Sequence, residues 1–149
     1  MAENGRTVTA ELQLHQRLAR KGQDYYEQAK ELAGVAVNKK AFGDDRRQMR
    51  SLETLAFRAR SPVDVFAFIK SQTGKEGKKE GWRYNDFGRR LLTHLEELKG
   101  EATELVQQVY GNTQDAGRLL EVHLELVRLY IRHLVSQYLY DRPQEETTP

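Results

Sequence analysis

Residues 116–140 read AGRLLEVHLELVRLYIRHLVSQYLY, and this stretch decides the fold. Apolar side chains recur at steps of four and three residues, the spacing that places them on one face of an α-helix. They are Leu120, Leu124, Val127, Ile131, Leu134 and Tyr138. A second apolar stripe lies beside them, formed by Leu119, Val122, Leu126 and Leu129. A helix that is apolar over so much of its circumference packs on several neighbours at once, which predicts a helical bundle.

The chain upstream of this stretch shows helical spacing nearly throughout. Helices are expected at about 7–37, 46–59, 61–72, 85–98 and 101–110, and no stretch alternates as a strand does. The sequence therefore predicts the all-α class: a single helical bundle of five to six helices over residues 1–142, followed by a disordered tail at 143–149. We expect the last helix to be the longest and the most buried.

Several boundaries have local signals. Ser61 is a good N-cap, Pro62 suits the first helical position, and the apolar run that follows predicts a short, central helix. Gly22 favours a kink or break in the first helix, since glycine costs about 1 kcal/mol there relative to alanine. The stretch from Ser71 to Gly81 holds three glycines and no large apolar side chain, so it predicts a loop.

Composition excludes several functional classes. The chain has 149 residues and no cysteine, so disulfides, thiolate metal sites and cysteine nucleophiles are excluded. Its uncharged apolar runs are far shorter than the ~20 residues of a membrane helix, and the first residues lack the apolar core of a secretory signal. We therefore expect a cytoplasmic protein without a membrane partner.

The residues that catalysis or metal binding require do not form a recognisable motif. Thr73-Gly74-Lys75 is no phosphate-binding P-loop, because the upstream glycine and the following Ser or Thr are missing. The four histidines are His15, His94, His123 and His133, and they show neither HExxH nor Glu-x-x-His spacing. His15 and His133 lie on or beside apolar stripes, which favours hydrogen-bonded core histidines. We expect a non-enzyme with no cofactor and no bound metal.

Charge is distributed unevenly along the chain. Residues 1–60 carry twelve Lys/Arg against eight Asp/Glu, whereas residues 100–149 carry four against eight. Basic residues interleaved with aromatic ones are typical of surfaces that bind nucleic-acid phosphates. The candidate binding residues are Lys39, Lys40, Arg46, Arg47, Arg50, Arg58, Lys75, Lys78, Lys79 and Arg83, with Arg89 and Arg90 close by.

Two simpler interpretations stay open for this basic set. Arg46, Arg47 and Arg50 could pair with neighbouring carboxylates as an ordinary solvated helix face. Trp82 could be the anchor that closes the Gly/Lys loop onto the core, rather than a platform for a base. A helix that reads base edges is disfavoured, because VDVFAFIK at 63–70 offers few polar side chains.

Three segments together carry a resemblance to a known family. RQMRSLETLA at 47–56, VFAFIKSQTGK at 65–75 and LELVRLYIRHLVSQYLY at 124–140 resemble the small all-helical (Csm/Cmr-type) subunit of type III CRISPR interference complexes, over roughly residues 44–142. The resemblance implies a non-catalytic subunit, present in several copies, that stacks against other effector subunits. It also implies contacts to the backbone of the crRNA–target duplex or target strand through Arg46, Arg47, Arg50 and the Lys75–Arg83 loop. That long Gly/Lys loop departs from the family pattern.

A second hypothesis is a protein–protein adaptor or scaffold with no role in nucleic-acid binding. It rests on the acidic last third of the chain and on the wide apolar surface of the 116–140 helix. Copurified RNA would favour the ribonucleoprotein subunit, and its absence would favour the adaptor.

Overall fold

The computed structural model describes residues 2–111 and 115–142, with side chains from residue 9 onward. Within those ranges the chain forms five α-helices and one 3-10 helix, and no strand. The elements are α1 (Ala2–Ala36), α2 (Arg47–Arg58), α3 (Pro62–Lys75), η1 (Gly81–Asp86), α4 (Phe87–Tyr110) and α5 (Ala116–Asp141). The predicted all-α bundle is confirmed, and the tail expected at 143–149 lies outside the described residues.

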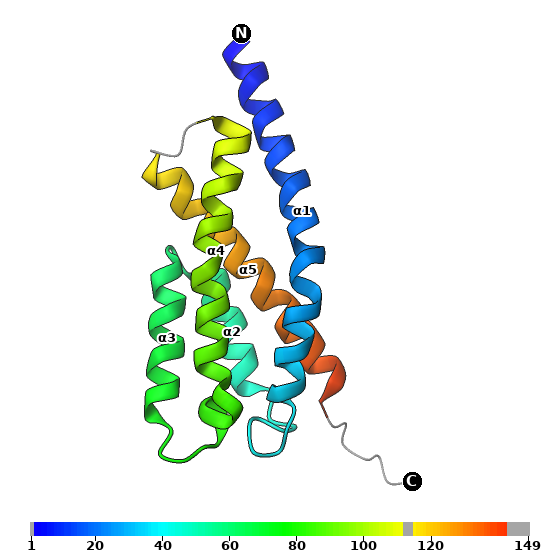
Figure 1. Cartoon of the computed structure of the whole chain (residues 1–149), viewed down its shortest axis with the longest axis vertical. Helices are drawn as coiled ribbons and strands as arrows, with labels where there is room; N and C mark the ends of the chain where they lie inside the picture. Colours follow the sequence, from blue (N-terminus) through cyan, green and yellow to red (C-terminus); the bar gives the residue numbers. More distant parts are fainter. Residues whose placement is uncertain (1, 112–114, 143–149) are drawn as a thin grey trace.

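Helix α5 is the element around which the others are arranged. It crosses the upright helices obliquely and packs against α1, α2, α3 and α4 (Figure 1). Its buried face carries most of the expected seam, although Leu120 at the N-terminal end is 43% exposed. The prediction of a central last helix is confirmed, but α5 is not the longest helix: α1 spans 35 residues and α5 spans 26.

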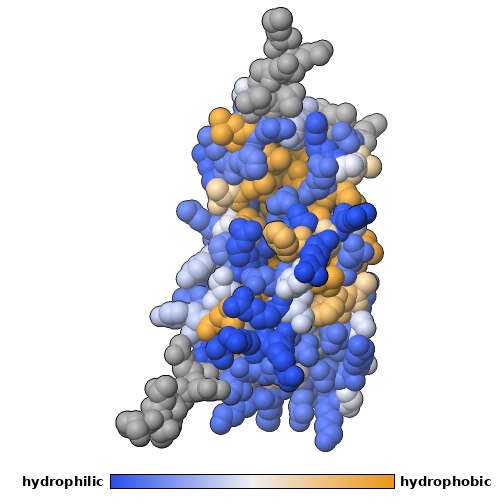
Figure 2. Space-filling view, turned by 180° about the vertical axis from the view of Figure 1, so that it is seen from behind, coloured by the Kyte–Doolittle hydropathy of each residue, from blue (hydrophilic) through white to orange (hydrophobic). Residues whose placement is uncertain are grey.

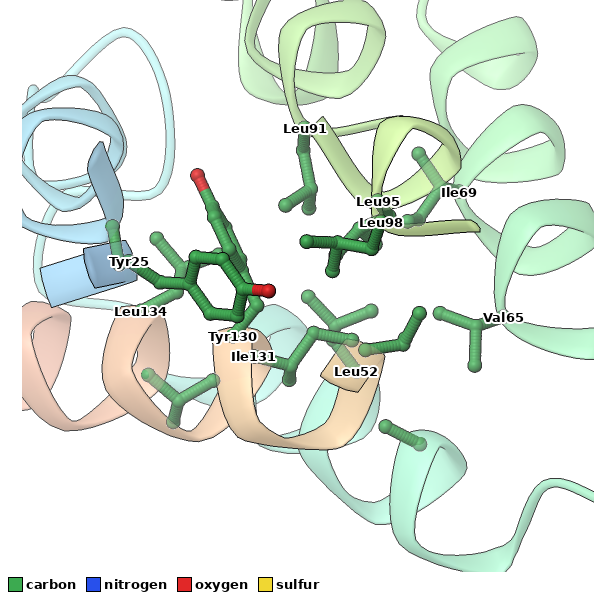
Figure 3. Close-up of a cluster of buried hydrophobic side chains, with 14 of the residues drawn as sticks. Tyr25, Leu52, Val65, Ile69, Leu91, Leu95, Leu98, Tyr130, Ile131 and Leu134 are labelled. Carbon is green, nitrogen blue, oxygen red and sulfur yellow. The ribbon is translucent and has the colours of Figure 1, made fainter. Parts of the chain in front are cut away.

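The core forms where side chains from all five α-helices converge. Figure 3 shows Tyr25 of α1, Leu52 of α2, Ile69 of α3, Leu95 of α4 and Ile131 of α5 around one apolar centre. All five are almost fully buried. Apolar burial at this scale is the main favourable term in folding, so this cluster fixes how the helices sit relative to one another.

Two predicted helix breaks are wrong. Helix α1 runs without interruption through Gly22, and α4 continues through Gly100, where two helices were expected. At Gly22 a β-carbon would come within 3.2 Å of the His133 imidazole, so glycine allows α1 and α5 to approach closely. At Gly100 nothing lies within 4 Å of an added β-carbon. A single glycine costs only about 1 kcal/mol, which packing on α5 outweighs.

Helix α3 begins as predicted but lies at the side of the bundle. The Ser61 hydroxyl accepts a hydrogen bond from the Val63 amide, and Pro62 follows it at the first turn. The expected central position is wrong, since Val63 is 64% exposed and the buried face is restricted to Pro62, Val65 and Ile69. The helix also extends to Lys75, because Thr73 and its neighbours continue the helical hydrogen bonding that the glycine-rich sequence obscured.

Arg128 of α5 fixes the end of α2. Its guanidinium donates hydrogen bonds to the carbonyl oxygens of Ala56, Phe57 and Ala59 at 2.9, 3.1 and 2.9 Å. Carbonyls at a helix C-terminus lack partners within the helix, so a planar cation is a suitable ligand for them. The sequence places Arg128 on a polar face, and the structure shows that it joins two helices.

Candidate nucleic-acid interface

Two basic connections meet at one end of the bundle. The segment 37–46 joins α1 to α2, and the segment 76–86 joins α3 to α4 through η1; both lie at the lower end in Figure 1. The Gly81 amide donates a hydrogen bond to the Lys40 carbonyl oxygen at 2.7 Å. This contact brings together two stretches of lysines about forty residues apart in sequence. We call residues 38–47 and 75–90 the basic end.

Charge is concentrated at the basic end. Its two segments carry ten Lys/Arg and five Asp/Glu, whereas the whole chain carries 24 and 22. The rest of the protein is therefore net negative, and the small overall charge of +2 conceals a polarised molecule. Seen from behind, the lowest part of the surface is hydrophilic, whereas apolar side chains gather higher up (Figure 2).

The basic end is built on an aromatic anchor. Trp82 is fully buried, with its ring centroid 5.3 Å from that of Phe42 and 5.6 Å from that of Phe87. Its indole N–H donates to the Gln48 side chain at 3.2 Å, so the one polar atom of the ring is satisfied. The anchor interpretation of Trp82 is confirmed, and the buried ring cannot serve as an exposed stacking platform.

Helix α5 holds the other connection in place. The Tyr138 hydroxyl lies 2.9 Å from the Gly43 carbonyl oxygen and 2.8 Å from that of Asp45, and both accept its proton. Burial is the main cause that raises the pKa of this hydroxyl above its usual value, so Tyr138 stays a donor at neutral pH. The sequence marks Tyr138 as a core residue, and it also positions the lysine-bearing loop.

The connection between α3 and α4 contains unusual backbone geometry. Asn85 and Asp86 are the only non-glycine residues in the described ranges with positive φ, at 48° and 55°. Two consecutive left-handed residues cost energy that the surrounding structure must supply, and such strain is common at functional sites. Gly88, two residues on, is needed for close packing, because a β-carbon there would overlap the Thr73 hydroxyl and lie 3.1 Å from the Trp82 carbonyl oxygen.

The structure sorts the ten candidate cations into distinct groups. Lys39 and Lys40 on one connection face the same end of the bundle as Lys78 and Lys79 on the other. None of the described residues forms a hydrogen bond or ion pair with these four ammonium groups. Lys75 belongs to the last turn of α3 rather than to the expected loop, which places it on a fixed helix end.

The α2 arginines are largely engaged by neighbouring carboxylates. Arg47 donates two side-chain hydrogen bonds to Asp45, both at 3.0 Å, and Arg50 pairs with Glu53 at 3.4 Å. Hydrogen bonding from Arg47 lowers the pKa of Asp45. Arg46 forms no ion pair with any described residue, and Arg58 is exposed at the opposite end of α2, away from the basic end. This supports the solvated-face interpretation for two of the three arginines.

Arg83 is held in a defined position. Its Nε donates to the Thr73 carbonyl oxygen at 2.8 Å, at the C-terminal end of α3. The residue lines an open pocket of about 310 Å³, together with Thr73, Lys79, Trp82, Asn85, Asp86 and Arg89. From the sequence, Arg89 is only a neighbour of the candidate residues; in the structure it lines the same pocket as Arg83.

The histidines do not form a site. His123, not His15, is the buried one, and its Nε2 lies 3.0 Å from the Leu95 carbonyl oxygen. His15 is exposed and His133 half-buried, so the expectation of core histidines is wrong for both. Among the described residues, no three His, Asp or Glu side chains are grouped so that they could hold a metal ion.

Across the same ranges, no helix has the length and apolar character needed to span a bilayer.

Comparison of the chain with protein-family models, with curated proteins and with solved structures gives no match. The basic end is accordingly interpreted from its own geometry. That geometry provides cations on fixed elements beside a turn with two left-handed residues. Such an arrangement can bind phosphate groups.

Proposed function

We propose that this protein is a non-catalytic subunit that binds the phosphate backbone of RNA through the basic end. The observation that carries the proposal is the hydrogen bond between Gly81 and Lys40, which joins two lysine-bearing connections into one surface. Lysine and arginine side chains that neutralise phosphates release condensed counterions, and this supplies affinity without reading the sequence.

The distribution of polar groups favours backbone contacts over base recognition. The cations of the basic end lie on connections and helix ends rather than along the exposed face of one α-helix. Lys39, Lys40, Lys78 and Lys79 are not held in ion pairs within the described ranges, so they can approach a phosphate without first losing a partner.

The assembly that fits this proposal is a crRNA-guided ribonucleoprotein of the cytoplasm, as the sequence resemblance implies. In that assembly several copies stack against other effector subunits, and their basic ends follow the guide–target duplex or the target strand. A net charge of +2 is small for tight binding by one copy, so affinity would come from copies lined up along one strand.

Charge-neutralising variants test RNA binding directly. The triple variant Lys39→Gln, Lys40→Gln, Lys78→Gln removes three exposed cations of the basic end, and the control Arg20→Gln, Arg60→Gln, Lys99→Gln removes three exposed cations elsewhere. Fluorescence anisotropy with labelled RNA duplexes should show weaker binding only for the first. The slope of log affinity against log salt should fall by about 0.7–0.9 per lost phosphate contact. An equal loss of RNA affinity in both variants would mean that only net charge matters, and would refute binding at a defined basic end.

Purification from the native host tests the assembly. The tagged protein should copurify with several effector subunits and with RNA of one defined length class, and the basic-end variant should retain the proteins while losing part of the RNA. Protein partners without any RNA would overturn the proposal.

A groove between α1 and α5 favours the adaptor as a second candidate function. It is lined by Ala19, Gly22, Gln23, Tyr26, Leu129 and His133 around a volume of about 390 Å³. Tyr26 at its edge is 45% exposed. The groove lies outside the basic end, so an adaptor role predicts that substitutions in the groove, rather than loss of lysines, abolish complex formation.

A further inference from the structure

The pocket beside Arg83 continues into a second, more apolar pocket. The first, of about 310 Å³, lies between η1, the start of α4 and the end of α3. The second, of about 260 Å³, is lined by Ile69, Lys70, Thr73, Gly74, Arg83, Gly88, Arg89 and Leu92. Thr73, Arg83 and Arg89 line both, so the two pockets adjoin, and we refer to them together as the depression. Volumes of this size are typical of small-molecule sites.

The first half of the depression is cationic. Lys79, Arg83 and Arg89 come from the connection, from η1 and from α4, and Asp86 is the one carboxylate in the lining. The Thr73 carbonyl holds the Arg83 Nε, which leaves the terminal nitrogens of the guanidinium to act as a fork. Arg89 has no hydrogen bond or ion pair from its side chain within the described ranges.

The second half is apolar and shallow. Ile69 of α3 and Leu92 of α4 line it, and Gly74 adds no side chain, with nothing within 4 Å of a β-carbon built there. Arg83 and Arg89 line both halves, so their guanidinium groups are available to the apolar half as well as to the cationic one. Aromatic bases stack well on such planes and on apolar walls.

We propose that this depression binds one unpaired nucleotide, with its phosphate on Lys79, Arg83 and Arg89 and its base in the apolar half. The inference deepens the proposed function and rests on it: the nucleotide would be an unstacked unit of the RNA that the basic end holds. A free mononucleotide has the same chemistry and is the other source. Asp86 favours a nucleotide over inorganic phosphate, because a ribose hydroxyl or an exocyclic amine can donate to its carboxylate.

The left-handed pair Asn85-Asp86 is consistent with this role. Both residues line the cationic half, and their backbone geometry holds this turn against α4. Asparagine and aspartate tolerate the left-handed region better than other non-glycine residues, and their side chains supply a donor and an acceptor for a nucleotide. The left-handed turn therefore coincides with a pocket lined by three cations and by the polar side chains of Asn85 and Asp86.

Trp82 provides a direct readout of occupancy. It is the single tryptophan of the chain and it lines the cationic half, so a fluorescence change on titration is assigned to one position beside this pocket. The full-length protein would be titrated with adenosine and uridine monophosphates, inorganic phosphate, a short single-stranded RNA and a blunt RNA duplex. We expect saturable changes with the single strand, smaller affinity for the mononucleotides, and no response to phosphate alone.

Two variants assign the effect to the pocket. Arg89→Gln leaves no structural partner unpaired and should weaken single-strand affinity about tenfold, as loss of one charged hydrogen bond does. Leu92→Asn should weaken binding of the strand and the mononucleotides while leaving duplex binding unchanged. Arg58→Gln, which removes the same charge on exposed α2, is the matched control.

The outcomes separate the two proposals. Duplex binding that is lost in the lysine variant, combined with no fluorescence response to any single strand or mononucleotide, would overturn the nucleotide pocket and leave the backbone-binding function intact. A response to mononucleotides without RNA affinity would refute the backbone function and identify a free nucleotide as the ligand. Equal weakening by Arg58→Gln and Arg89→Gln would also overturn the pocket.

Discussion

Two groups of arginines, one on α2 and one around the start of α4, differ in what surrounds them. On α2, Arg47 and Arg50 are engaged by carboxylates two and three residues away. Arg83 on the connection between α3 and α4 is held by a backbone carbonyl, and Arg89 at the start of α4 has no charged partner in the described ranges. The same residue type is therefore neutralised locally in one group and left available to an anion in the other.

This difference shows that arginine content alone does not define an anion-binding surface. A guanidinium paired with a carboxylate must exchange one partner for another, and the exchange gains little free energy. A guanidinium positioned by a neutral carbonyl keeps its full charge and has already lost much of its side-chain freedom. The predictions below test whether the α3–α4 connection is the rigid, available group and α2 the compensated one.

Trp82→Ala should have the largest effect, because it removes the anchor beneath the available group. Loss of a fully buried aromatic side chain costs about 3–5 kcal/mol in free energy of unfolding. Urea unfolding followed by circular dichroism measures the loss. A variant that is destabilised by less than about 1 kcal/mol would show that the connection does not depend on the core. The α3–α4 connection would then not be the more rigid of the two groups.

The sequence predicts much of this fold, because local signals and tertiary packing agree over most of the chain. The period of 116–140 predicts a central helix, and Ser61-Pro62 predicts the start of α3. The glycine signals fail at Gly22 and Gly100 because their cost of about 1 kcal/mol is smaller than the gain from packing on α5. Periodicity is misleading for a different reason at Leu12. Its spacing continues the apolar stripe of α1, yet the side chain is 57% exposed, because periodicity does not show where a neighbouring helix ends.

The candidate site is predictable only in part. The anchor role of Trp82 follows from its position after a glycine-rich loop, and the pairs of Arg47 and Arg50 follow from carboxylates within three residues. The contact of Gly81 with Lys40 joins segments about forty residues apart, and no local signal specifies it. The pocket depends on that contact and on the close packing at Gly88, so it appears only when the helices are assembled.

Arg128→Met should have the second largest effect and adds a third kind of arginine to the comparison. Arg128 is half-buried and donates to carbonyls at the end of α2, so its loss leaves those acceptors to water. We expect a loss of about 2 kcal/mol in the free energy of unfolding. Arg128→Lys should recover less than half, because an ammonium lacks the planar fork that reaches several carbonyls. Full recovery by lysine would show that charge alone matters here.

Replacing two glycines of α4 by alanine should change the free energy of unfolding in opposite directions. Gly88→Ala places a β-carbon against the Thr73 hydroxyl, which is held by a hydrogen bond to the Ile69 carbonyl, and should cost about 1–3 kcal/mol. Gly100→Ala, with nothing within 4 Å, should stabilise the protein by about 0.5–1 kcal/mol. Unfolding midpoints measure both changes.

The double variant Thr73→Ala, Gly88→Ala shows which contact causes the stability loss of Gly88→Ala. Removing the hydroxyl should recover most of the stability lost at Gly88, giving a clear interaction energy between the two positions. No recovery would place the strain in the Trp82 carbonyl, 3.1 Å from the added carbon, and would identify the connection itself as the rigid element.

The smallest effect concerns the pair of Asp45 with Arg47, and it tests the α2 side of the comparison most directly. Hydrogen bonding from Arg47 lowers the pKa of Asp45 in the folded state, so the pair contributes stability above the ordinary pKa of about 3.9. That contribution disappears as the pH falls through the lowered value, because the folded and unfolded chains are then both protonated. Arg47→Gln should return the pKa of Asp45 toward its usual range, as followed by NMR titration. It should leave stability at acid pH unchanged and lower it slightly at neutral pH.

Titration of Asp45 in the presence of saturating RNA then decides between the two groups of arginines. If α2 is the compensated group, RNA leaves the Asp45 titration of the wild-type protein unchanged, since Arg47 keeps its carboxylate. A pKa that rises toward the usual range on RNA binding would mean that Arg47 has exchanged Asp45 for a phosphate, and the distinction between the two groups would be lost.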